Sequence, residues 1–219
     1  DVYRRTAKFV TISGYLLGVN PFDQPDVEAA KIAARKLTSE YETTGTLAAP
    51  TALVSEAGMT AFAGAEYARR LTGTGGGSGL DAVLRQHLGS IEAGDYFAIN
   101  AYVDMNDANI ATLQSLRHAV RAAKKCATTL GFGPRFLHST GQLHKGGANN
   151  GVFLQITADD AHDLAIPGQR FSFGILKTAQ AQGDFEVLVE RNRRVLRIHL
   201  GADVTQGLQV LGQRIAALL

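Results

Sequence analysis

This chain of 219 residues has a single cysteine, a small net charge and no long apolar run. Because Cys126 is its one cysteine, no disulfide can form within the chain and nothing indicates secretion. No stretch reaches the ~18 uninterrupted apolar residues that a membrane span needs. A formal net charge of +2 argues against a dedicated nucleic-acid or anionic-membrane surface. We therefore expect a cytoplasmic protein that binds neither nucleic acid nor a membrane, with Cys126 as an inert structural thiol.

The composition is that of an ordinary globular protein, 45% hydrophobic and 19% charged. A chain of this length can bury one substantial core. It begins at Asp1 without an initiator methionine or a signal-like segment. We expect either a processed chain or a piece of a longer protein.

Hydrophobic periodicity and turn residues predict two helices near the N-terminus, over 6–19 and from Pro25 to about Tyr41. A short hairpin over 52–63 is expected to turn at Gly58. The glycine-rich stretch 73–79 follows a predicted helix rather than a strand, which favours a flexible connector over a phosphate loop. Further helices are predicted over 80–92, 108–125, 178–183, 184–192 and 204–219, and strands over 96–103, 127–131, 152–157, 171–176 and 195–200.

Strands separated by helices of this length indicate βαβ units. The runs at 96–103 and 152–157 are nearly continuously apolar, which is typical of strands buried on both faces. We therefore predict an α/β fold, a three-layer αβα sandwich with a mainly parallel, flavodoxin-like sheet and additional N-terminal helices. The chain divides into a helical segment (1–45), a hairpin with the glycine-rich linker (46–79) and the α/β unit (80–219).

The stretch 138–147 (His-Ser-Thr-Gly-Gln-Leu-His-Lys-Gly-Gly) holds the highest density of side chains that could bind a ligand or transfer a proton. We expect it to lie in a loop after the strand 127–131, where α/β folds place their sites. Histidine is a common proton-transfer residue near neutrality, which makes His138 a candidate, although a lone loop histidine is more often a hydrogen-bonded structural residue. A metal site would need ligands beyond His138 and His144, and no acidic or cysteine partner is nearby in sequence.

A second stretch, 20–31, reads Asn-Pro-Phe-Asp-Gln-Pro-Asp-Val-Glu-Ala-Ala-Lys. It resembles the aromatic-Asp-Gln-x-Gly-Val-Glu-x-x-Lys signature of phosphoglucose isomerases, with Asp26 at the position of the glycine. His138-Ser-Thr-Gly-Gln resembles the His-Ser-Met-Gly-Gln segment of the same family. The longer stretch 131–147 is still more similar to the isomerase half of bifunctional transaldolase/phosphoglucose isomerases. The lysine motif precedes the histidine motif, as in those fusion proteins.

The resemblance implies interconversion of glucose 6-phosphate and fructose 6-phosphate in a sugar-isomerase-like domain, without a metal or organic cofactor. His138 would then open the sugar ring, and Lys31 would stabilise charge on a substrate oxygen. Gln24, Ser139 and Gln142 would bind substrate hydroxyls. We find neither the family's Ser/Thr-rich phosphate cradle nor the segment that carries its carboxylate base. The expected partners are therefore a hexose phosphate and an upstream segment of the same polypeptide, and a homo-oligomer is left open.

Two other interpretations remain. A solvated helix lysine is the ordinary interpretation of Lys31, which lies three residues from Glu28. The chain could be a non-catalytic sugar-phosphate-binding module, which would bind but not turn over. It could also be an oligomerisation domain, in which case Lys31 and His138 should lie far apart and face solvent.

Overall fold

The computed structural model describes residues 2–73 and 78–219. The fold is built around a six-stranded sheet. Its strands are β1 (Val54–Glu56), β2 (Met59–Ala63), β3 (Tyr96–Tyr102), β4 (Ala127–Phe132), β5 (Gly151–Thr157) and β6 (Arg194–His199). They run in the order β1-β2-β6-β5-β3-β4. The four strands β6, β5, β3 and β4 are parallel, and the hairpin β1–β2 joins β6 in antiparallel orientation.

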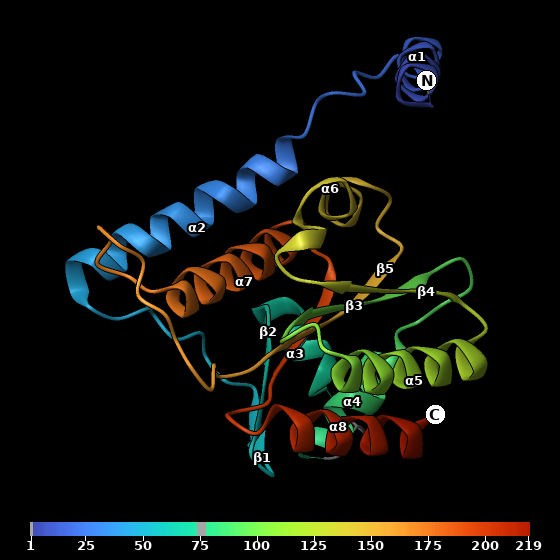
Figure 1. Ribbon diagram of the computed structural model, residues 1–219. Helices are drawn as coiled ribbons and strands as arrows, with labels where there is room; N and C mark the ends of the chain where they lie inside the picture. The colour runs from blue at the N-terminus through green and yellow to red at the C-terminus, as the bar shows by residue number, and fades with distance from the viewer. Residues whose placement is uncertain (1, 74–77) are drawn as a thin grey trace.

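Helices cover both faces of this sheet (Figure 1). The helices are α1 (Val2–Leu17), α2 (Pro25–Thr44), α3 (Ala65–Leu71), α4 (Leu80–Gly89), α5 (Asp107–Lys124), α6 (Ser139–Gly146), α7 (Phe173–Glu190) and α8 (Val204–Leu218), with a 3-10 turn, η1 (Arg135–Leu137). On one side α4 and α5 pack against α8, and on the other α2 packs against α6 and α7. The predicted three-layer α/β fold with a mainly parallel sheet is confirmed.

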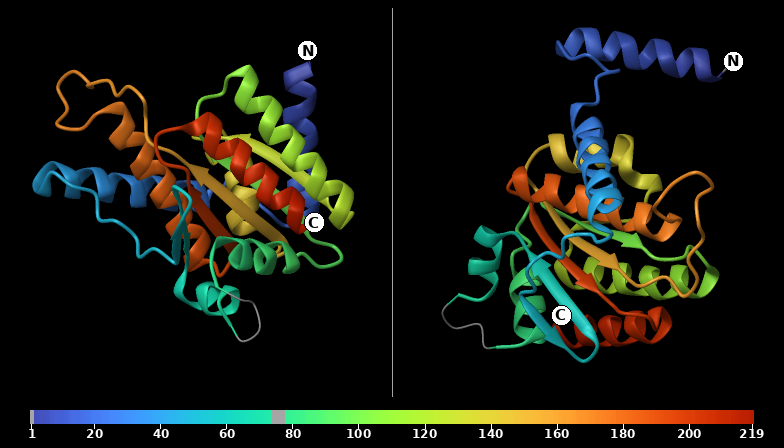
Figure 2. Two further views of the ribbon diagram at one scale, coloured as in Figure 1. Left: turned by 90° about the horizontal axis from the view of Figure 1, so that it is seen from below. Right: turned by 90° about the vertical axis from the view of Figure 1, so that its left-hand side faces the viewer.

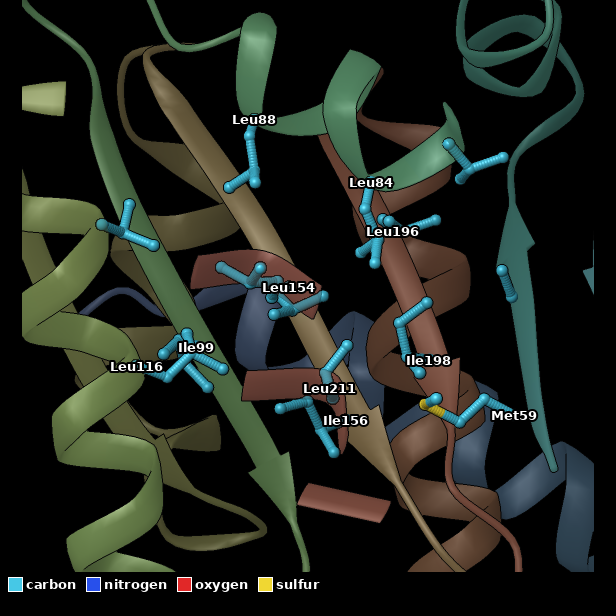
Figure 3. Packing of buried hydrophobic residues seen from close by; sticks show 14 of the residues in the cluster. Met59, Leu84, Leu88, Ile99, Leu116, Leu154, Ile156, Leu196, Ile198 and Leu211 are labelled. Atoms are coloured by element: carbon cyan, nitrogen blue, oxygen red, sulfur yellow. The ribbon is translucent and has the colours of Figure 1, made fainter. Parts of the chain in front are cut away.

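The main core lies between the sheet and the layer of α4, α5 and α8 (Figure 3). Ile99 and Leu154 from neighbouring parallel strands meet Leu116 of α5 and Leu211 of α8, and none of the four is more than 4% exposed. Burying one such side chain contributes about 1.5–3 kcal/mol. This core fixes the sheet, and the sheet in turn fixes the opposite layer.

In that opposite layer, α2 and α7 approach closely at Gly183. A Cβ atom there would lie 3.0 Å from the backbone nitrogen of Ala34 and 3.1 Å from the carbonyl oxygen of Ala30. The small residues on both helices therefore let the two backbones touch. This contact fixes the position of α2, and with it the side of α2 that carries Lys31.

The hairpin, predicted to turn at Gly58, is confirmed: φ is 52° at Ala57 and 76° at Gly58. Helix α1 stands apart from the layers (Figure 2) and leaves Phe9, Ile12 and Leu16 exposed. None of the helices described is both long enough and apolar enough to cross a membrane. Residues 74–77 of the glycine-rich connector lie outside the described residues.

Two predicted elements are wrong. The stretch 139–146 is not a loop but helix α6, because its Gly141, His144 and Lys145 are spaced to bury one face. The stretch 171–176 is not a strand either. The Ser172 hydroxyl accepts a hydrogen bond from the Ile175 backbone N–H and so caps α7, which continues unbroken through both predicted helices of this region.

The three sequence segments share one architecture. The hairpin from 46–79 extends the sheet at β6, and α2 from 1–45 packs on α7 of the α/β unit. Residues from each segment therefore meet in the same layers.

Candidate functional site

A cavity of about 500 Å³ lies between α2 and the segment that follows β4. Lys31 of α2 lines this cavity. His138, the residue between η1 and α6, lines it as well. The apolar part of its wall is contributed by Val27, Ala30 and Ala34 of α2. Two residues far apart in sequence thus share one cavity, as the isomerase resemblance predicts. Both residues are also exposed, as the oligomerisation interpretation expects, but they do not lie on separate surfaces as that interpretation requires.

The cavity is rich in cationic groups. Arg35 and Arg135 line it together with Lys31, and no aspartate or glutamate is among its described lining residues. The Lys31 side chain is 54% exposed and lies 3.6 Å from the Glu28 carboxylate, which also pairs with Arg35. A salt bridge this exposed contributes little to stability. Lys31 and Arg35 are therefore free to exchange Glu28 for an anionic ligand.

Gln142 joins α6 to α2 through side-chain hydrogen bonds. Its side-chain oxygen accepts hydrogen bonds from the backbone N–H groups of Asp26 (3.0 Å) and Val27 (3.3 Å), at the N-terminus of α2. Its side-chain nitrogen donates to Asp26 Oδ2 at 2.9 Å. With these atoms engaged, Gln142 acts here by joining α6 to α2, which sets the separation of Lys31 and His138.

Asp26, which departs from the isomerase signature, has a structural explanation. It is 4% exposed, and its Oδ1 accepts from Arg191 Nε at 2.9 Å and pairs with Arg191 Nη2 at 2.8 Å. A Cβ on Gly146 would lie only 2.4 Å from Asp26 Oδ2. The aspartate therefore requires glycine at position 146.

The other two predicted ligands lie outside the cavity lining. Gln24 is exposed immediately before α2, and its side chain makes no capping hydrogen bond. Ser139 is exposed as the first residue of α6. Ser139 directly follows the lining residue His138, and Gln24 stands three residues before the lining residue Val27.

Two residues of the polar stretch are core residues. His144 is 3% exposed and packs at a tilt against the aromatic rings of Tyr96 and Phe153, and burial lowers its pKa to about 4. Lys145 forms a salt bridge with the equally buried Asp184 of α7. No cluster of three potential metal ligands occurs in the described part of the chain.

Sequence reasoning missed Asp184 and Arg135. Asp184 gave no signal, because a lysine and an aspartate far apart in sequence indicate a pair only when the fold brings them together. Arg135 had a signal: it stands three residues before His138 in the stretch that resembles the isomerases.

No family model matches this chain, and no curated protein matches it. Among solved structures, a hypothetical protein from Thermus thermophilus is similar, with a TM-score of 0.54 and 16% sequence identity. The match covers 64% of this chain and 38% of that one, so the chain spans well under half the length of this neighbour. This similarity establishes a shared fold. Fold and cavity together define a three-layer α/β protein with a basic cavity beside α2.

Proposed function

We propose that this chain is the C-terminal part of a glucose-6-phosphate isomerase, from a bifunctional transaldolase/isomerase of the cytoplasm. The observation that carries the proposal is the shared cavity of Lys31 and His138. Each belongs to one of the two motifs that resemble phosphoglucose isomerases. A resemblance at two separate stretches gains weight when both stretches reach one cavity.

The chemistry fits the groups present. Opening the sugar ring requires a proton to reach the ring oxygen while another leaves the anomeric hydroxyl, and His138 is suited to carry it. Lys31 donates to an oxygen on which charge develops. Arg35 and Arg135 add positive charge that favours a phosphorylated ligand. The reaction needs no metal or organic cofactor.

The proton transfer between C1 and C2 needs a carboxylate, and no carboxylate is among the described residues that line the cavity. We propose that another part of a longer polypeptide supplies this base and the phosphate cradle. On this proposal residues 1–219 alone are essentially inactive as an isomerase. Robust conversion of glucose 6-phosphate by the purified fragment would contradict it.

The test uses the full-length protein and compares two variants with two matched controls. His138→Ala should slow turnover of the closed-ring substrate far more than turnover of an open-chain form, and Lys31→Ala should slow both. His162→Ala and Lys36→Ala, at exposed positions outside the cavity lining, should leave turnover unchanged. Equal turnover in all four variants would reject the proposal.

The missing carboxylate favours one alternative, a non-catalytic sugar-phosphate-binding module. It predicts that fructose 6-phosphate binds to the full-length protein in calorimetry, that Lys31→Ala weakens this binding, and that no turnover occurs. Measured isomerase activity of the full-length protein separates the two.

A further inference from the structure

A second cavity, of about 480 Å³, opens at the carboxyl ends of β3, β5 and β6. The last residues of these strands, Tyr102, Thr157 and His199, are cross-strand neighbours, and all three line it. The chain leaves β3 toward β4 and leaves β5 toward β6, in opposite directions along the sheet. Open parallel sheets bind ligands at such a switch point.

This cavity is separate from the one beside α2. Thr178 and Gln182 of α7 line it, whereas Leu176 and Gln180 of the same helix line the cavity of Lys31. Helix α7 thus stands between two cavities. Neither isomerase motif contributes a residue to the second one.

Arg197 is the unusual group of this cavity. It is 6% exposed, and it donates from Nε to the Gln155 side chain at 2.6 Å and from Nη2 to the Ala181 carbonyl at 2.9 Å. Its third nitrogen, Nη1, has no acceptor among the described residues. No described carboxylate lies within salt-bridge distance of Arg197, since the buried Asp184 forms its salt bridge with Lys145. Asp184 and Glu186 attract the guanidinium from further away, and its Cζ lies 4.3 Å from the centroid of the Phe185 ring.

A buried charge without a counter-ion is costly, and in most proteins it is paired. Burial lowers the pKa of Arg197 to about 10, so the guanidinium stays charged at neutral pH. Because Arg197 lines the cavity, a ligand can supply the directly contacting counter-ion that the described residues do not. The ligand group is therefore an anion.

The carboxylates of the cavity restrict that anion. Asp159 lies 3.3 Å from His199, Asp160 pairs with Lys177, and Asp163 accepts hydrogen bonds from Ser172 and from backbone N–H groups. Each is thus already engaged, but all three keep negative charge in the lining. A dianion such as phosphate would be repelled by them more strongly than a monoanion.

The other residues that line this cavity are suited to a small organic molecule. Leu47, Phe62 and Ile175 provide apolar surface, while the Thr157 hydroxyl, which hydrogen-bonds His199 at 3.1 Å, offers a polar atom for a ligand hydroxyl group. We propose that this cavity binds a small hydroxylated monocarboxylate whose carboxylate pairs with Arg197. The planar guanidinium fork matches a carboxylate, and the volume is that of a small-molecule site.

The test titrates gluconate into the full-length protein by calorimetry, with glucitol as the neutral analogue that lacks the carboxylate. We expect saturable binding of gluconate and none of glucitol. Arg197→Met should weaken gluconate binding at least about tenfold, because it removes a charge-assisted pair. Lys31→Ala should leave it unchanged, which separates this site from the proposed isomerase site.

A second variant is needed because Arg197→Met also removes two buried hydrogen bonds. Thr178→Trp places a large side chain at an exposed position of the cavity lining and should abolish gluconate binding. Thr43→Trp, at an exposed position on α2, is its control and should bind normally. Gluconate that fails to bind at millimolar concentration, or binds Thr178→Trp as well as the parent, overturns the proposal. Inorganic phosphate binding that Thr178→Trp abolishes overturns the choice of a monocarboxylate.

Discussion

The side chains of Gln142 and Asp26 are joined by a hydrogen bond of 2.9 Å between two helices that come from separate sequence motifs. Through it, the segment that carries His138 is fastened to the helix that carries Lys31. The geometry of the candidate site therefore depends on a residue that does not line its cavity.

Replacing Gln142 should loosen this junction. Gln142→Ala leaves two backbone N–H groups of α2 and Asp26 Oδ2 without their hydrogen-bond partner, and should lower the free energy of unfolding by about 1–3 kcal/mol. Urea denaturation measures this. Thr140→Ala, at an exposed position of the same helix, should change it by less than about 0.5 kcal/mol. If both variants lose the same stability, Gln142 has no special role.

Gly146 and Asp26 should be energetically coupled. Gly146→Ala forces a methyl group against Asp26 Oδ2 and Gln142 Nε2, and should cost about 1–3 kcal/mol. Adding Asp26→Gly should recover part of that loss in a double-mutant cycle. Gly212→Ala, where a Cβ meets nothing within 4 Å, is the control and should be neutral or stabilising. Strictly additive costs for positions 26 and 146 would contradict the coupling.

The buried pair of Lys145 and Asp184 should be much more sensitive to single than to double replacement. Lys145→Met leaves an unpaired buried carboxylate and should destabilise the protein by about 3–5 kcal/mol. Lys145→Met combined with Asp184→Leu should be less destabilised than Lys145→Met alone, because no charge is then left unpaired. Chemical denaturation of the parent and the two variants checks this order. The opposite order would show that the pair matters for its packing and not its charge.

His144 should make stability fall in acid. Burial lowers its pKa to about 4 from an ordinary value of 6.5, so between these pH values the unfolded chain binds a proton that the folded protein does not. Stability is therefore lost as the pH falls through this range, by up to about 1.4 kcal/mol per pH unit. His144→Phe should flatten the pH dependence of the unfolding midpoint, and His162→Phe, at an exposed position, should not. A pH profile that His144→Phe leaves unchanged would count against this assignment.

Local pattern was sufficient for most elements of the fold. Apolar runs at 96–103 and 152–157 predicted parallel strands, and Pro25 and Gly58 marked the start of a helix and a hairpin turn. These features depend on backbone preferences and on side chains a few residues apart, which the sequence displays directly. The same pattern failed at 139–146 and 171–176, where short apolar or polar stretches do not distinguish a helix from a loop or a strand.

The sequence by itself determined the sheet, its helical layers and the two stretches with chemical groups. Only the tertiary structure decided what those groups do next to one another. It placed Lys31 and His138 on one cavity and made Gln142 the hydrogen-bonded junction of α6 and α2. It also buried Lys145 against Asp184 and left Arg197 without a salt bridge to any described carboxylate. The physical reason is that these contacts join residues from separate elements, so their free energy depends on how the helices pack on the sheet. No spacing within one element records that packing.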